Sequence, residues 1–263
     1  MRKHDASYKP TLVFHGTNSV FMGVELELQP RNSRRRNTST VDLDRSDWYC
    51  KYDVSLRTGG EEYVSHPRTL ESWRNLLQSG WPFDSRTFSV LSRGYGMHVH
   101  ASTRYLSPEY QGRRYAVAVG IRCLVRKIHR SFPELYLRIC GRQPNGWRSL
   151  TGDVGCHYSG VGLRSHTLEF RIFLSTTTPR KFMERLEFVD ACMRYAKHTR
   201  PANPARPRFN AHNFLRWILA NEAMYPKLAN ALREMGFEVP AQAAATPVAA
   251  IELPVAEAQV AAA

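Results

Sequence analysis

The sequence predicts an α+β protein, because short alternating segments and segments with helical spacing follow one another along the chain. Alternation of apolar and polar residues is typical of a strand with one buried face, and an apolar residue every three or four positions is typical of an amphipathic helix. The predicted strands span 21–28, 48–53, 61–65, 97–101 and 167–173. The predicted helices span 70–77, 108–131, 179–198 and 212–235, the last as one helix or a pair.

Two of these strands divide their residues between a core face and a charged face. Glu25 and Glu27 alternate with apolar residues in the first strand, and Glu169 and Arg171 do so in the last. Successive side chains of a strand point to opposite faces, so the charged residues of each strand share one face. The apolar residues that we expect in the core are Val24, Leu26, Leu28, Leu168, Phe170 and Ile172.

The long helix predicted at 108–131 has an apolar stripe and a basic remainder. We interpret its many arginines as a solvated face rather than a docking surface. The segments 31–47 and 141–162, which are rich in Arg and in turn formers respectively, are predicted to be loops. The stripe consists of Tyr115, Ala118, Ile121, Val125 and Ile128.

The composition favours a soluble protein with an affinity for anions. Lys and Arg number 37 against 23 Asp and Glu, which gives a net charge of +14, but charge alone does not name the anion. The sequence has no run of about 18 apolar residues and no apolar stretch typical of a secretory signal near its start. Its five cysteines lie far apart without a C-x-x-C pair, which indicates reduced thiols. We therefore expect a cytoplasmic protein that does not insert into a membrane.

Polar residues at alternate strand positions form a candidate metal site. Carboxylates on neighbouring strands repel one another, so a face that gathers several of them needs protons or divalent cations between them. Oxygen ligands with an imidazole suit Mg2+ or Mn2+ better than zinc. Mg2+ commonly joins carboxylates to substrate phosphates, and a guanidinium beside it would stabilise a transferring phosphoryl group. The residues concerned are Glu25, Glu27, Asp53, Glu62, His98, His100, Glu169 and Arg171.

Five short motifs carry these residues. They are Gly23-Val-Glu-Leu-Glu27, Asp53-Val-Ser-Leu56, Glu62-Tyr-Val-Ser-His-Pro67, Gly96-Met-His-Val-His100 and Leu168-Glu-Phe-Arg-Ile-Phe173. In this order and spacing they resemble the amidoligase family, which is related to glutamate-cysteine ligase and glutamine synthetase. The motif that begins at Gly96 is also similar to a signature of glutamine synthetase. The resemblance covers roughly residues 20–198.

The resemblance implies an ATP-dependent ligase that joins a carboxylate to an amine through an acyl phosphate. It places His100 at the phosphates of ATP, and it gives Glu169 and Arg171 catalytic roles, with Arg171 at the γ-phosphate or the acyl phosphate. The family motif Asp-Gly-Ser is Asp53-Val-Ser in this chain, and Glu61 is an alternative to Glu62. Two or three Mg2+ ions would be held by Glu25, Glu27, Asp53, Glu62, His98 and Glu169.

The resemblance also implies a fold and a domain organisation. The related ligases have a curved, mainly antiparallel sheet, with the active site on its concave face and helices packed on its convex side. This sequence has no Gly-rich phosphate loop, so ATP would be held through metal and arginine. The implied parts are an N-terminal extension at 1–19, a catalytic domain at 20–198, a Pro-rich linker with a C-terminal helical segment at 199–239, and a disordered Ala-rich tail at 240–263.

Two other classes of function remain open from the sequence. A two-metal nuclease would also gather carboxylates, and the basic body suits a polyanionic substrate. A nucleic-acid-binding protein is suggested by the arginines at 31–36 and by the basic helix, although the loop 31–47 lacks aromatic residues that stack on bases. The carboxylate, small or part of a peptide, and the amine are not identified, and the oligomeric state is open. We expect the loops 31–47 and 141–162 to determine specificity.

Overall fold

An antiparallel sheet and the helices on one of its faces make up the described part of the chain. The computed structural model describes residues 3–17, 19–31, 47–53, 56, 59–90, 94–106, 112–146, 148–199 and 208–238. The strands are β1 (Met22–Pro30), β2 (Trp48–Lys51), β3 (Glu61–Ser65), β4 (Phe88–Ser89), β5 (Gly96–Ser102), β6 (Val161–Leu163) and β7 (Thr167–Leu174). The helices are α1 (Leu70–Ser79), α3 (Arg114–Ser131), α4 (Pro133–Cys140), α5 (Pro179–His198), α6 (Ala211–Ala220) and α7 (Pro226–Arg233), with a 3-10 helix η1 (Thr103–Tyr105).

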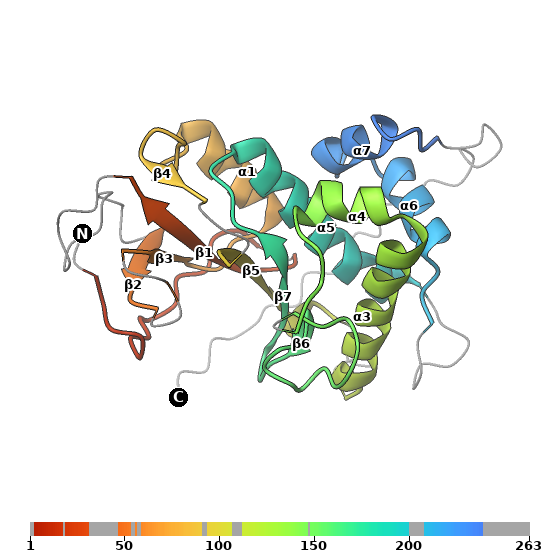
Figure 1. Ribbon diagram of the computed structural model, residues 1–263. Helices are drawn as coiled ribbons and strands as arrows, with labels where there is room; N and C mark the ends of the chain where they lie inside the picture. The colour runs from red at the N-terminus through yellow and green to blue at the C-terminus, as the bar shows by residue number, and fades with distance from the viewer. Residues whose placement is uncertain are drawn as a thin grey trace.

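The sheet has the strand order β2-β3-β1-β5-β7-β6, and β4 pairs with β1 off this path. Each pair of neighbouring strands in the described residues is antiparallel. The sheet is curved and does not close into a barrel. In Figure 1, β2 and β3 lie at one side of the molecule and α3, α4, α6 and α7 gather at the other. The predicted α+β class with a mainly antiparallel sheet is confirmed.

The register of β1 with its neighbours brings the charged residues together. Glu25 stands opposite His98 of β5, and Glu27 stands opposite Glu62 of β3. His100 of β5 in turn stands opposite a glutamate of β7, Glu169. Residues directly opposite one another on antiparallel strands share a face. These side chains therefore lie on one side of the sheet, which we call the polar face.

The opposite side of the sheet carries the hydrophobic core. Val24, Leu26 and Leu28 are at most 1% exposed, as their alternation predicts. Helix α5 covers this side: it packs against β5 and α1, and its Phe188 ring contacts Phe173 of β7. The sheet therefore separates an apolar side, covered by helices, from the polar face.

The core prediction for β7 is confirmed, because Leu168, Phe170 and Ile172 are all buried, but the pairing of β7 with β5 is irregular. The pairing of β5 with β7 shifts by one residue at His98, so Arg171 and Ile172 together oppose that histidine. Phe173 therefore stands opposite Met97 and is buried as well. An extra residue in one strand interrupts the two-residue period, so simple alternation does not account for the burial of Phe173.

The helix predicted at 108–131 is α3, which begins at Arg114, and residues 107–111 lie outside the described residues. Tyr115, which the predicted stripe included, is 53% exposed. Arg122, which was assigned to the solvated face, is buried. Tyrosine is intermediate in its preference for the interior, so an apolar count places it in the core too readily. The residues that α3 buries are Val117, Ala118, Gly120, Ile121, Arg122, Leu124, Val125 and Ile128.

Four short elements were not predicted, namely α4, β4, β6 and the 3-10 helix η1. Helix α4 has a proline at its first position and ends at Gly141, whose φ of 75° is left-handed, so it uses the usual signals for a start and a stop. At eight residues it is too short to show a clear apolar period. The segment 141–162, predicted to be irregular, includes the start of β6 and a bridge between Ser149 and Ser159.

The N-terminal and C-terminal segments both pack against the body. His4 forms a parallel bridge with Lys51 of β2. Helices α6 and α7, the predicted pair, contact α3 and α5, and Phe214 and Leu228 belong to the common core. Most of the predicted loop 31–47, the linker 200–207 and the tail 240–263 lie outside the described residues.

The five cysteines all lie in the described residues and form no disulfide with one another, and Cys50, Cys140 and Cys192 are buried. Among the described helices, none is long and apolar enough to cross a bilayer.

Candidate active site

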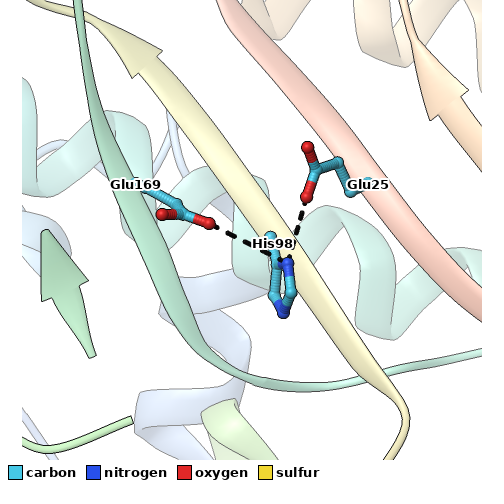
Figure 2. Close-up of side chains that lie close together, drawn as sticks. All are labelled: Glu25, His98 and Glu169. Carbon is cyan, nitrogen blue, oxygen red and sulfur yellow. Dashed lines mark hydrogen bonds and ion pairs between the residues drawn. The ribbon is translucent and has the colours of Figure 1, made fainter. Parts of the chain in front are cut away.

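The centre of the polar face is a cluster of two carboxylates around one imidazole, shown in Figure 2. Glu25 comes from β1, His98 from β5 and Glu169 from β7, and the three side chains point toward one another. His98 Nδ1 lies 3.1 Å from Glu25 Oε2 and 3.9 Å from Glu169 Oε1. One ligand atom from each residue lies within 4.8 Å of the others, so the three could bind one divalent cation.

His100 adds a second imidazole to this cluster. Its Nε2 atom lies 3.3 Å from Glu25 Oε1 and 3.8 Å from Glu169 Oε1. Burial alone would raise the pKa of Glu25, but the charges and hydrogen bonds of His100 and His98 hold it well below its usual value. Burial likewise would lower the pKa of His100, but Glu25 raises it overall. Glu25 is therefore ionised and ready to bind a cation at neutral pH.

Glu27 lies on the other side of the His98 ring. Its Oε1 atom is 3.7 Å from His98 Nε2, and its Oε2 atom accepts a hydrogen bond from the backbone N–H of Gly96. A Cβ atom at Gly96 would stand 2.8 Å from His98 Nε2, so only glycine leaves room for the imidazole here. Burial raises the pKa of Glu27 above its usual value.

Glu62 and Asp53 lie beside Glu27 on the polar face. Burial, followed by the charge of Glu25, raises the pKa of Glu62 to about 8. The charge of Asp53 raises the pKa of Glu62 and of Glu27, which places this residue among the same group of carboxylates. Glu61, the alternative to Glu62, instead binds Lys3 Nζ at 2.6 Å and the Tyr63 hydroxyl. The structure therefore places Glu62, and not Glu61, with the other candidate ligands.

Two arginines hold the carboxylate of Glu169. Arg171 Nη1 lies 2.8 Å from Glu169 Oε1, and Arg164 approaches Oε2 with Nη2 at 2.6 Å and Nε at 2.7 Å. Burial would raise the pKa of Glu169, but His100 and Arg171 lower it overall. Two guanidinium groups on one carboxylate form a site that is well suited to an anion.

Three arginines of the site were not predicted from the sequence. Arg164 reaches Glu169 because the turn between β6 and β7 folds back, with the Arg164 N–H donating to the Thr167 carbonyl. Arg142 and Arg148 come from the segment 141–162, and both are buried. The charge of Arg142 counters the rise that burial causes in the pKa of Glu27, and the charge of Glu27 in turn counters the fall that burial causes in the pKa of Arg148. The only signal for Arg142 and Arg148 was their place in the segment 141–162, which was expected to determine specificity.

No protein-family model matches this chain, and no curated protein matches it at a significant level. The family resemblance therefore rests on the five sequence motifs.

The geometry of the polar face fits a divalent cation. Carboxylate oxygens with one imidazole nitrogen are the donors that Mg2+ and Mn2+ accept, and Glu25, His98 and Glu169 supply them at one point. Glu27 lies within 4 Å of the same imidazole. Glu62 belongs to β3, and Asp53 follows the end of β2. The structure thus brings the predicted site residues of β1, β3, β5 and β7 to one face, with three of them in a tight cluster, while Asp53 acts on Glu27 and Glu62 through its charge.

We expect the metal-free protein to lose stability between pH 5 and pH 8 because of Glu62. Its pKa of about 8 exceeds the ordinary value of 4.5, so above pH 4.5 the unfolded chain releases a proton that the folded protein retains. Each pKa unit corresponds to about 1.4 kcal/mol. In EDTA, Glu62→Gln should match the wild type at pH 5 and exceed it by about 1.4 kcal/mol or more at pH 8 in urea unfolding. Parallel pH profiles of the two proteins would contradict this assignment.

Proposed function

We propose that the protein is an ATP-dependent ligase that forms an amide bond between a carboxylate and an amine, releasing ADP and phosphate. The observation that carries the proposal is the polar face, where Glu25, His98 and Glu169 meet and Arg171 and Arg164 hold Glu169. Acidic ligands beside fixed guanidinium groups are what the transfer of a phosphoryl group from a Mg2+-bound nucleotide requires.

The metal part of the proposal assigns two or three Mg2+ ions, or Mn2+, to the carboxylates and the imidazole of the cluster. When bound, these ions would neutralise the negative charge of the phosphates and of the acyl phosphate. Glu169, which touches both histidines and both arginines, would couple the metal ligands to the phosphate-binding groups. The proposed ligands are Glu25, Glu27, Asp53, Glu62, His98 and Glu169.

The phosphate part assigns His100 and Arg171 to ATP. His100 stands next to the metal cluster, with its Nε2 facing Glu25, so it can donate a hydrogen bond to a phosphate oxygen there. Arg171 presents its guanidinium from β7, 2.8 Å from Glu169, and would bind the γ-phosphate and then the acyl phosphate. We further propose the glutamine synthetase-like form of the fold, with the polar face concave and the helices on the convex side, and a cytoplasmic location.

The proposed reaction has two displacements. A carboxylate oxygen of the first substrate attacks the γ-phosphorus of ATP, the bond from this phosphorus to the bridging oxygen breaks, and ADP leaves. The amine nitrogen then attacks the acyl carbon, the bond from carbon to the phosphate oxygen breaks, and inorganic phosphate leaves as the nitrogen loses a proton. Activation as an acyl phosphate divides one difficult condensation into two easier steps.

The proposal is tested by phosphate release. With Mg2+ and ATP, the purified full-length chain should release phosphate in a panel of amino acids, peptides and amines only where a carboxylate and an amine substrate are both present, and mass spectrometry should find the amide. Divalent-dependent cleavage of DNA or RNA without ATP would instead indicate a nuclease. DNA binding that is independent of ATP and unchanged by Glu169→Gln, with no turnover across the panel, would indicate a nucleic-acid-binding protein.

A further inference from the structure

Arg142 is a buried cation at the edge of the polar face. It follows Gly141, whose left-handed backbone turns the chain from α4 back toward the sheet. Its Nη2 atom lies 3.1 Å from the place that a Cβ atom would occupy at Gly96, directly beside the His98 ring. Among the described residues it forms no ion pair within 4.0 Å. Its pKa is lowered to about 9, first by burial and then by Arg148.

The Arg142 guanidinium instead binds three backbone carbonyl groups. Nη2 donates to the carbonyl of Arg171 at 2.7 Å, Nη1 to that of Tyr95 at 3.3 Å, and Nε to that of Ile172 at 3.4 Å. These carbonyls belong to two segments, the start of β5 and the middle of β7. Only an arginine can donate from three different nitrogen atoms in this way, since the side chain of lysine has a single nitrogen.

The first of these segments leads to Glu27. The peptide group between Tyr95 and Gly96 has its carbonyl on Arg142 and its N–H on Glu27 Oε2. A cation on the carbonyl polarises the amide and strengthens the hydrogen bond that its N–H donates. Arg142 thus acts on the Glu27 carboxylate through one peptide unit, as well as through its charge.

The second segment leads to Arg171. The carbonyls of Arg171 and Ile172 lie where β7 has one residue too many for β5, at the position opposite His98. Backbone groups at such a bulge lack regular partners in the strand ladder, so they need other donors to stay in place. Arg142 supplies those donors and fixes the offset from which the Arg171 side chain reaches Glu169.

We propose that Arg142 is a positioning residue of the site: by tying the Tyr95–Gly96 peptide to the bulge of β7, it holds the Glu27 carboxylate and the Arg171 side chain in their places. This inference rests on the proposed metal site for its consequence, which is metal affinity. Groups that orient metal ligands from outside commonly change the affinity 10-fold to 100-fold when they are replaced.

The test compares Arg142→Lys with Arg185→Lys. Arg185 is also a buried arginine that binds backbone carbonyls, those of Ile139 and Leu174, and it contacts neither Glu27 nor the Tyr95–Gly96 peptide. Both variants lose a buried guanidinium, so we expect similar decreases in the melting temperature. Titration with Mn2+, followed by electron paramagnetic resonance, should show about 10-fold weaker binding for Arg142→Lys and unchanged binding for Arg185→Lys.

A second measurement does not depend on the metal. The amide proton of Gly96 donates to a carboxylate, so its NMR signal should lie far downfield in the metal-free wild type and in Arg185→Lys, and should move upfield in Arg142→Lys. Unchanged Mn2+ binding and an unchanged Gly96 signal in Arg142→Lys would overturn the inference. If the wild type bound no Mn2+, the proposed metal site would fail, and the Gly96 signal would still decide the role of Arg142.

Discussion

Glu169→Gln should weaken Mn2+ binding by about 100-fold or more and abolish ATP-dependent amide formation. The substitution keeps the shape of the side chain and removes its charge. Replacement of a group that merely orients a metal ligand costs up to about 100-fold in affinity, so loss of a ligand should cost at least as much. The same change leaves Arg164 and Arg171 without the carboxylate that they share, at a distance of 2.6 to 2.8 Å in the native protein.

The matched control for this experiment is Glu71→Gln. Glu71 is an exposed carboxylate in the first turn of α1, on the helix-covered side of the sheet. Isothermal titration with Mn2+ and the phosphate-release assay should find this variant equal to the wild type. Full activity in Glu169→Gln, with normal Mn2+ affinity, would rule out the cluster as the reaction centre.

The candidate site could be predicted from the sequence because a strand has a period of two. Glu25 and Glu27 had to share a face, as did Glu169 and Arg171, whatever the strand order was. The order itself, which places β1 beside β5 and β5 beside β7, is a long-range property that no local pattern contains. The family resemblance implied that these residues share one site, although the strand order could not be predicted.

The features that the sequence did not predict depend on how the strands pair, and not on the two-residue period within a strand. Arg164 stands five residues before Glu169, and only the turn between β6 and β7 brings the two together. The choice of Glu62 over Glu61 was made from the spacing of the motif, and the register of β1 with β3, which sets Glu62 opposite Glu27, agrees with it. The bulge opposite His98, which the sequence analysis did not predict, likewise arises from the pairing of two strands.

A second polar cluster, away from the candidate site, lies along α5. Three of its acidic residues are completely buried, namely Glu184, Glu187 and Asp190. Each has basic or hydrogen-bonding partners from neighbouring elements, as a buried charge requires. Glu187 has a particular role: its Oε2 accepts the backbone N–H of Leu228 at 2.7 Å, and its Oε1 lies 3.3 Å from Arg74 Nη2.

The Leu228 N–H is one of the first amides of α7, which have no partner within their own helix. The residue before the helix, Tyr225, makes no capping hydrogen bond through its side chain. Glu187 therefore caps α7 from another helix, and its negative charge lies at the positive end of the α7 dipole. It joins α5, α7 and, through Arg74, α1.

Glu187→Ala should therefore lower the free energy of unfolding by about 3 kcal/mol, because it removes the cap of α7 and leaves the buried N–H of Leu228 without its acceptor. For a chain of this size that is a decrease of roughly 6 to 12 °C in melting temperature. The control is Glu234→Ala, which removes a half-exposed carboxylate that also pairs with two arginines, Arg138 and Arg180. Exposed pairs contribute at most about 1 kcal/mol, so equal losses for the two variants in urea unfolding would show that burial and capping do not distinguish Glu187.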